Sequence, residues 1–239
     1  MLGLALLGLW QLLWQTETVA EYLLPSPANV ARALRLGVES GLFWDYARVT
    51  LQESVVGFCI GALIALPVGY GIAHSRLLDR ALQPYLAASQ AVPAIAIAPL
   101  FVLWLGYGLR TVAALCALIV FFPMVMNTAL GIRRLDADVL DAARVDGAGR
   151  RALLLHFEVP LALPIIMVGV RTSLTLSITG AVVGEFVLGD QGLGGLLTIA
   201  RGSFNTPLVF ATIIVLMVMA TAMYFVAWSA EQLLARRQR

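Results

Sequence analysis

The sequence predicts an all-α protein that crosses a lipid bilayer about six times and forms one transmembrane domain over residues 1–239. Of its 239 residues, 60% are hydrophobic and only 13% are charged, and the mean hydropathy is +0.89. The charged fraction is about half that of an ordinary soluble domain. A chain of this length fits one soluble domain or about six helices of roughly 20 residues, and the hydropathy favours the second.

Apolar stretches recur along the chain at lengths that match the thickness of a bilayer. Five of them approach the roughly 20 residues that a spanning helix needs: residues 55–73, 86–105, 111–130, 163–186 and 208–228. Residues 1–14 are apolar but short, and we expect them to form a sixth, N-terminal span. Between the first two spans, Ser26 and Asn29 are both suitable N-caps for a surface helix over residues 28–36.

The distribution of arginine predicts the orientation of the chain in the membrane. All 16 basic residues are Arg. If the N-terminus is cytoplasmic, residues 74–85, 131–162 and 229–239 are cytoplasmic and hold ten of them, while the outer segments hold five. Cytoplasmic loops carry an excess of positive charge. The bias therefore places both termini and residues 131–162 in the cytoplasm, and it makes the basic tail a topological anchor rather than a nucleic-acid contact.

A charged, helix-forming island lies at residues 141–160, DAARVDGAGRRALLLHFEVP. It is preceded and opened by acidic side chains that suit the positive end of a helix dipole: Asp136, Asp138 and Asp141. Ala142 and Ala143 leave a smooth surface for close approach. Gly147 and Gly149 permit a turn that residues with a Cβ resist.

After this turn, the sequence predicts a second short helix over residues 150–157. Pro160 and Pro164 follow it, and we expect them to restart the chain as a membrane span. A solvated connector is the plain alternative for the whole segment, but a connector has no need of these spacings.

The spacing of the island resembles the EAA loop of bacterial ABC importer permeases, whose pattern is EAA-x3-G-x9-I-x-L-P. The matching positions are Asp141, Ala142, Ala143, Gly147, Phe157 and Pro160. Asp141 replaces Glu, Phe157 replaces Ile and Val159 replaces Leu, each conservatively. The segment Leu24-Pro25-Ser26-Pro27 is also similar to permeases of the branch that handles nitrate, sulfonates, taurine and pyrimidine-type vitamin precursors.

The resemblance implies a type I ABC importer permease fold in the bacterial inner membrane, with residues 131–162 docked in a cleft of a cytoplasmic ATPase. It also implies two ATPase copies, a second permease copy in a homodimer, and an extracytoplasmic binding protein that delivers a small solute. The chain has no Lys and no GxxxxGK motif followed by Ser or Thr, which a phosphate-binding loop needs. ATP and Mg²⁺ are therefore expected on the ATPase, with no cofactor and no enzyme activity on this chain.

Polar residues within the spans are candidates for the translocation path, since such groups normally face protein or water. The candidates are Gln90, Asn127, Arg171, Thr175, Thr179 and Glu185, with Glu185 near the outer interface. A stripe of small residues accompanies them at helical spacing: Ser173, Ser177, Gly180 and Gly184. The stripe suits either close packing against another helix or the lining of a pore.

An ion- or proton-coupled secondary transporter is the alternative function. Such proteins place ionisable groups or broken helices near the middle of the membrane, whereas here Arg171 is the only charge set firmly within a span. A membrane scaffold would not need the pattern at residues 141–160. His74 and His156 lack partners at the spacing that zinc requires, so we expect solvated histidines and no metal site. Cys59 and Cys116 are expected to be packing residues.

Overall fold

The computed structural model describes residues 2–16, 20, 23–189 and 191–236, and this part of the chain is helical without a strand. The first helices are α1 (Leu2–Gln15), α2 (Pro27–Glu39), α3 (Leu42–His74), α4 (Arg76–Ala91), α5 (Ala94–Leu105) and α6 (Leu109–Arg133). They are followed by α7 (Ala137–Val145), α8 (Arg150–Ala152), the π-helix η1 (Leu153–Glu158), α9 (Val159–Leu188), α10 (Gly192–Gly202) and α11 (Thr206–Arg236).

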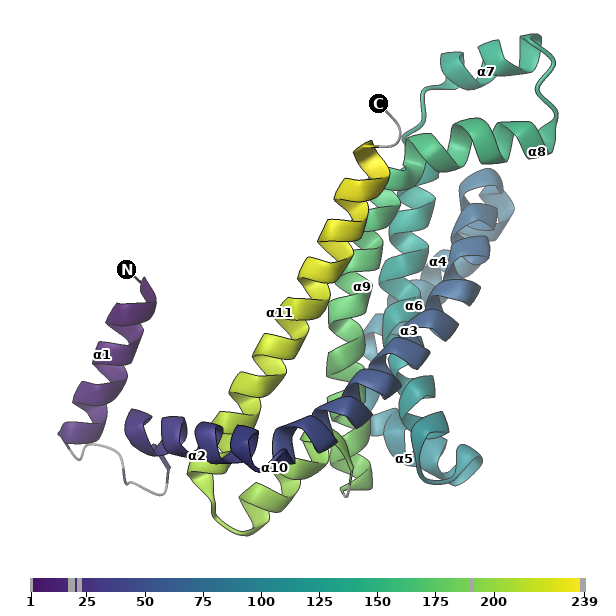
Figure 1. Cartoon of the computed structure of the whole chain (residues 1–239). Coiled ribbons are helices and arrows are strands. Elements are labelled where there is room, and N and C mark those ends of the chain that lie inside the picture. Colours follow the sequence, from purple (N-terminus) through teal and green to yellow (C-terminus); the bar gives the residue numbers. More distant parts are fainter. Residues whose placement is uncertain (1, 17–19, 21–22, 190, 237–239) are drawn as a thin grey trace.

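The long helices α3, α6, α9 and α11 form a bundle, and most of the short helices lie at its two ends, while α4 runs beside it and α1 stands apart (Figure 1). One end carries α7 and α8, and is called the α7 end below. The other carries α2, α5 and α10, and is called the α10 end. The surface helix predicted at residues 28–36 is α2, and of its two possible caps Ser26 is the one used, since its Oγ accepts from the Asn29 N–H at 3.1 Å.

Four helices are long and apolar enough to cross a membrane: Leu42–His74, Leu109–Arg133, Arg150–Leu188 and Thr206–Leu233. They confirm four of the predicted spans. The fifth, at residues 86–105, is not one helix but two, because α4 ends at Ala91 and α5 begins at Ala94. The helix α1 has 14 residues, fewer than the roughly 20 that a span needs.

Pro93 explains the break between α4 and α5. A residue before proline is sterically driven out of the α region, and Val92 is accordingly extended, with φ −85° and ψ 118°. Proline also has no N–H to donate to the preceding turn. The sequence already contained this signal, which a count of apolar residues overlooks.

Small residues on α3 bring it into close contact with α6. A Cβ added at Gly57 would lie 2.2 Å from the Cβ of Cys116, and one at Gly69 would lie 2.7 Å from the Cβ of Thr128. These distances leave no room for a side chain. In a bilayer, where lipid is as apolar as leucine, such backbone approach is a main source of helix association.

The small-residue stripe on α9 packs against the same helix, which confirms the packing interpretation. A Cβ at Gly180 would lie 2.9 Å from the Cα of Cys116. The Ser173 hydroxyl donates to the Val120 carbonyl at 3.4 Å, and Ser177 is fully buried. The bundle core is thus built on α6, with α3 and α9 on either side.

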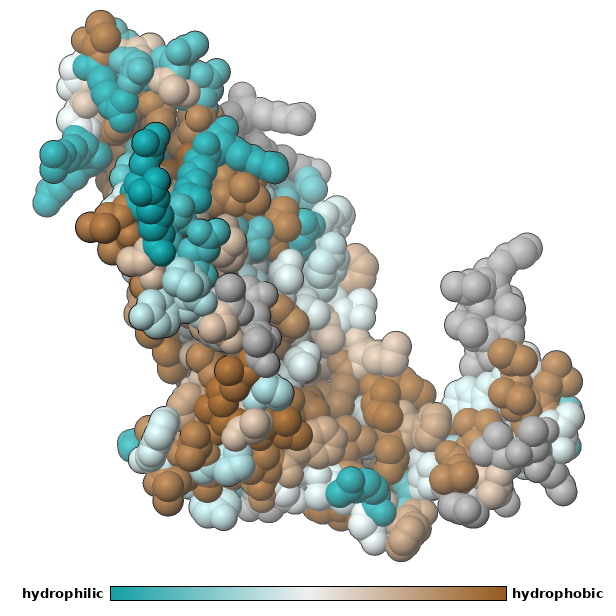
Figure 2. Space-filling view, turned by 180° about the vertical axis from the view of Figure 1, so that it is seen from behind, coloured by the Kyte–Doolittle hydropathy of each residue, from teal (hydrophilic) through white to brown (hydrophobic). Residues whose placement is uncertain are grey.

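The surface follows the arrangement of the helices. Hydrophilic side chains gather at the α7 end, and apolar side chains cover most of the middle of the bundle (Figure 2). Large apolar side chains such as Leu63 on α3 and Val226 on α11 are more than half exposed. An apolar girdle with a polar end is the surface expected of a membrane protein.

Candidate docking segment and polar groups of the bundle

Helix α7 is defined at both ends by its own sequence. The Asp136 carboxylate caps the beginning, where its Oδ1 accepts the Asp138 N–H at 3.0 Å. At the other end, Ala148 N–H donates to Ala143 O and Gly147 N–H to Arg144 O, both at 3.0 Å. This pair of bonds is a Schellman motif, which requires a left-handed residue. Gly147 supplies it with φ +89°, so the predicted turn is confirmed.

The two alanines of the island have different surroundings. Ala142 is exposed, as predicted, but Ala143 is buried at 4% exposure, so the expectation of a shared outer surface is wrong for Ala143. Helix α7 packs on η1, and Ala143 lies on its inward side. Asp141 is exposed and pairs with Arg144 one turn later. The outer face of α7 therefore presents Asp141 and Ala142.

The second helix begins at Arg150 as predicted, but it does not end at Phe157 and Pro160 does not restart it. Helices α8, η1 and α9 form one continuous run over Arg150–Leu188, in which the Val159 N–H donates to Leu154 O, five residues back. Pro160 is the second residue of α9 and has no N–H to donate to the turn before it. The run changes direction here (Figure 1), as helices do at π-turns and prolines.

Three side chains tie the start of α9 to the end of α3, and we call them the Glu158 cluster. The Tyr70 hydroxyl donates to Glu158 Oε2 at 2.8 Å, and His74 Nε2 lies 3.1 Å from Glu158 Oε1. The rings of Tyr70 and His74 are 4.3 Å apart. Glu158 is 2% exposed, and a buried carboxylate is stable only with such partners. His74 is exposed, as expected of a solvated histidine, but it also pairs with the buried Glu158.

A second group of contacts joins three helices at the same end of the bundle. The Arg133 guanidinium on α6 lies 2.8 Å from the Asp79 carboxylate on α4 and donates to the Ile72 carbonyl on α3 at 3.0 Å. The α7 end is therefore held by ion pairs and hydrogen bonds between helices, in addition to apolar packing.

Arg171 is not a lone charge in the bundle. Its Nη1 lies 3.3 Å from Glu231 Oε2, and its guanidinium lies 5.4 Å from the centre of the Tyr224 ring. Both partners belong to α11, which continues to Arg236. Glu231 is therefore part of this helix and not of a separate C-terminal tail over residues 229–239, as the sequence predicted. Tyr224 and Glu231 are seven positions apart, two helical turns, which places them on one face.

Glu185 and Glu53 form a buried carboxyl pair beneath α10, at 1% and 2% exposure. The Gly194 N–H donates to Glu185 Oε2 at 2.6 Å, and the Leu193 N–H donates to Thr50 Oγ1 at 2.8 Å. Thr50 and Glu53 also interact with the Glu185 carboxyl group. The pair fixes the first turn of α10 to α3 and α9.

Among the remaining path candidates, the side chains that the structure describes bond within their own helices or are exposed. The Thr175 hydroxyl donates to Arg171 O at 3.1 Å and the Asn127 amide to Pro123 O at 2.8 Å, each within its own helix. Thr179 is exposed. Gln90 lies on α4, and its side chain is outside the described residues. Their role in a path stays a prediction.

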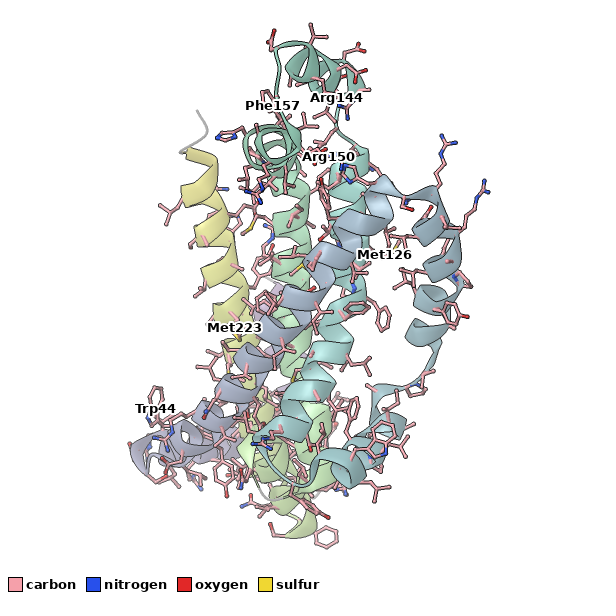
Figure 3. All side chains as sticks on the ribbon, turned by 90° about the vertical axis from the view of Figure 1, so that its right-hand side faces the viewer. Trp44, Met126, Arg144, Arg150, Phe157 and Met223 are labelled. Carbon is pink, nitrogen blue, oxygen red and sulfur yellow. The ribbon has the colours of Figure 1, made fainter. Side chains whose placement is uncertain are left out.

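A cavity of about 440 Å³ lies beside the break between α4 and α5. Its walls come from α5, α6 and α9 and from the break itself: Val92, Ala94, Ile97, Leu118, Ile119, Phe122, Pro123, Met126 and Leu176. Met126 lies on the side of α6 that faces α4 (Figure 3). Figure 3 also shows Arg144, Arg150 and Phe157 together at the α7 end, away from Met126.

Within the described part of the chain, no group of three or more His, Cys, Asp or Glu side chains is placed to hold a metal ion. Cys59 and Cys116 are free. The Cys116 thiol is buried and donates to the Ser177 carbonyl at 3.2 Å, which agrees with a packing role for this residue.

The fold and the sequence pattern define the class of this protein. Residues 57–239 match the family described as the binding-protein-dependent transport system inner membrane component, and the chain belongs to this family of ABC importer permeases. Solved permease-fold structures agree in architecture. The MetNI methionine ABC transporter in inward-facing form matches with a TM-score of 0.72 and 18% identity, over 81% of this chain and 97% of that one. The likeness confirms the fold predicted from the sequence.

Curated relatives are similar over nearly the whole chain. The riboflavin transport system permease protein RibX of Chloroflexus aurantiacus is 45% identical over 97% of this chain and 86% of its own length. The formylaminopyrimidine transport permease protein ThiX of Halalkalibacterium halodurans is 32% identical over 82% and 78%. The putative aliphatic sulfonates transport permease protein SsuC of Bacillus subtilis is 31% identical over 90% and 78%.

Proposed function

We propose that this chain is the membrane-spanning subunit of an ATP-driven importer and that residues 131–162 dock on a cytoplasmic ATPase. The observation that carries the proposal is the shape of this segment. Helix α7, closed by the Gly147 turn, stands beyond the ends of the membrane helices (Figure 1), and its outer face carries Asp141 and Ala142. A short helix with a small, exposed side chain at its centre suits close approach by another protein.

In the proposed orientation both termini and the α7 end are cytoplasmic, and the α10 end receives an extracytoplasmic binding protein. ATP and Mg²⁺ are bound by the ATPase, whose closure on ATP would draw two docked α7 helices together. The Glu158 cluster would pass this movement to α3, because Glu158 joins the run that contains α8 and α9 to Tyr70 and His74. Hydrolysis would then return the permease to its inward-facing form.

Two copies of this chain with two ATPase chains are the proposed composition. One chain offers one α7 and one Gly147 turn, and oligomers of identical chains are most often symmetric dimers. Native mass measurement of the purified complex gives the composition directly. A complex with one copy of this chain beside a different permease would contradict the homodimer.

The proposed solute is riboflavin or a similar uncharged heterocycle. The relative RibX, named for riboflavin transport, is 45% identical, whereas the relative named for aliphatic sulfonates is 31% identical. A sulfonate would need a positive partner inside the membrane. Arg171 is a positive charge on α9 within the bundle, and Glu231 already neutralises it at 3.3 Å.

The test uses the permease and ATPase reconstituted in liposomes with ATP inside and a binding protein outside. We expect riboflavin uptake that requires ATP and the loaded binding protein. ATP hydrolysis should rise with that protein and respond little to free riboflavin. Uptake that proceeds without ATP and stops when a protonophore is added would instead support the secondary transporter.

A further inference from the structure

The break between α4 and α5 lies beside α6, between the two ends of the bundle, and its residues Val92 and Pro93 are exposed. The segment begins at the α7 end, where Asp79 pairs with Arg133, and α5 lies at the α10 end (Figure 1). Between them, Val92 is extended and Pro93 provides no side-chain cap for α5. Non-helical backbone is tolerated at membrane depth only where it faces protein or a polar cavity. Something other than lipid tails must therefore lie against this break.

The cavity described above is at the same place. Val92 and Ala94, which flank the break, both line it. Its volume of about 440 Å³ falls within the range of roughly 300–1,000 Å³ that small-molecule sites occupy. Secondary transporters commonly build their solute sites at discontinuous helices, and a broken helix can serve the same purpose in an ATP-driven permease. Two separate observations, a broken backbone and a cavity of suitable size, thus coincide.

The walls of the cavity favour an uncharged aromatic solute. Phe122 offers a ring face, Met126 a polarizable thioether, and Leu176 an aliphatic surface, and no wall residue in the described part of the chain is charged. The negative dipole end of α4 meets the positive end of α5, so the two largely cancel. Helix ends leave backbone C=O and N–H groups without a partner inside the helix, and those at the end of α4 and the start of α5 could hydrogen-bond a solute. An anion would lose its hydration here without a compensating charge.

We propose that this cavity, the break cavity, holds the solute during transport and selects an uncharged, flat heteroaromatic molecule over a sulfonate. The inference rests on the proposed function and adds to it the place and the chemistry of recognition. Riboflavin suits the apolar walls because the faces of its fused ring are flat and apolar. It also suits the backbone at the break because its ring edge carries hydrogen-bonding atoms.

The first experiment fills the cavity. Met126→Trp places a large ring inside it, and Met217→Trp makes the same change on α11; both methionines are exposed, at 49% and 64%. In reconstituted complexes we expect riboflavin uptake to fall at least tenfold with Met126→Trp and to stay unchanged with Met217→Trp. Stimulation of ATP hydrolysis by the loaded binding protein should survive in both. Equal uptake by the two variants would overturn the inference.

A second experiment acts after folding. Met126→Cys, in a Cys59→Ala background, is treated with a methanethiosulfonate reagent; Cys116 is buried. We expect the reagent to block uptake and riboflavin to slow the reaction, while an alkanesulfonate at the same concentration does not. Protection by the alkanesulfonate, or a thiol that does not react with the reagent at all, would overturn the inference. A complex that never hydrolyses ATP would instead refute the proposed function.

Discussion

The Glu158 carboxylate accepts a hydrogen bond from the Tyr70 hydroxyl at 2.8 Å, although the two residues are 88 positions apart. Glu158 is the last residue of η1, and Tyr70 lies one turn before the end of α3. The contact therefore joins the continuous run that carries residues 150–188 to the first long helix of the bundle. In the proposed mechanism it is a mechanical link between the ATPase and the membrane helices.

Removing the Tyr70 hydroxyl tests this link. Tyr70→Phe leaves a buried carboxylate with one donor fewer, which should lower the free energy of unfolding by about 1–3 kcal/mol. Tyr85→Phe on α4 is the matched control, because Tyr85 is 74% exposed. Thermal unfolding of both variants in detergent is the measurement. Identical unfolding temperatures would show that the contact adds nothing.

The Gly147 turn can be tested by adding one methyl group. Gly147 has φ +89°, so Gly147→Ala should cost about 1–2 kcal/mol, although no atom lies within 4 Å of the added Cβ. Gly149→Ala is the control, since its φ is −69° and its Cβ position is equally open. If the ATPase docks here, its affinity should weaken roughly tenfold, the equivalent of about 1.4 kcal/mol, for Gly147→Ala alone. Equal affinities of the two variants would contradict the docking assignment.

The close contact between α10 and the Glu53 and Glu185 pair requires a glycine at position 194. In Gly194→Ala the Cβ would lie 2.8 Å from Glu185 Oε2 and 2.9 Å from Val182 O, and such overpacking costs about 1–3 kcal/mol. Gly202→Ala lies in the same helix and meets nothing within 4 Å. Only the first variant should unfold at a lower temperature. An unchanged unfolding temperature for Gly194→Ala would show that α10 can shift away from Glu185 without loss of stability.

Arg171 and Glu231 should behave as a coupled pair. Their side chains are 18% and 22% exposed, so either Arg171→Met or Glu231→Met leaves a poorly solvated charge and should cost about 1–3 kcal/mol. The double variant removes both charges and should recover most of that loss. Unfolding free energies of the four proteins give the coupling. Strictly additive losses would show that the two charges do not interact.

Much of the fold could be predicted because it depends on local patterns. Runs of apolar residues located four of the long helices, and the small-residue stripe of α9 indicated a close helix contact. The break at Val92 was missed because hydropathy averages over a window and gives one proline little weight. The length of α11 was underestimated for a related reason, since Glu231 is polar and yet remains in the helix as the partner of Arg171.

In the candidate site, too, local contacts could be predicted and contacts between distant helices could not. The Gly147 turn and the Asp136 cap were predictable, because each is a contact between residues a few positions apart. The Glu158 cluster and the Glu53 and Glu185 pair were not, because each joins residues on different long helices. A single sequence contains no signal for which faces of two distant helices will meet. For the same reason Ala143 was expected on the surface, when the packing of α7 on η1 buries it.

The π-helix η1 has a consequence for the direction in which α7 faces. A π-turn contains one residue more than the α-helical turn it replaces, and each residue of an α-helix turns the chain by roughly 100°. Deleting one residue from η1, for example the exposed Leu155, would convert it to ordinary α-helix. Helix α8, and with it α7, would then rotate by about that angle around the axis of the continuous run. A single inserted residue thus sets the direction in which the outer face of α7 points around the axis of this run.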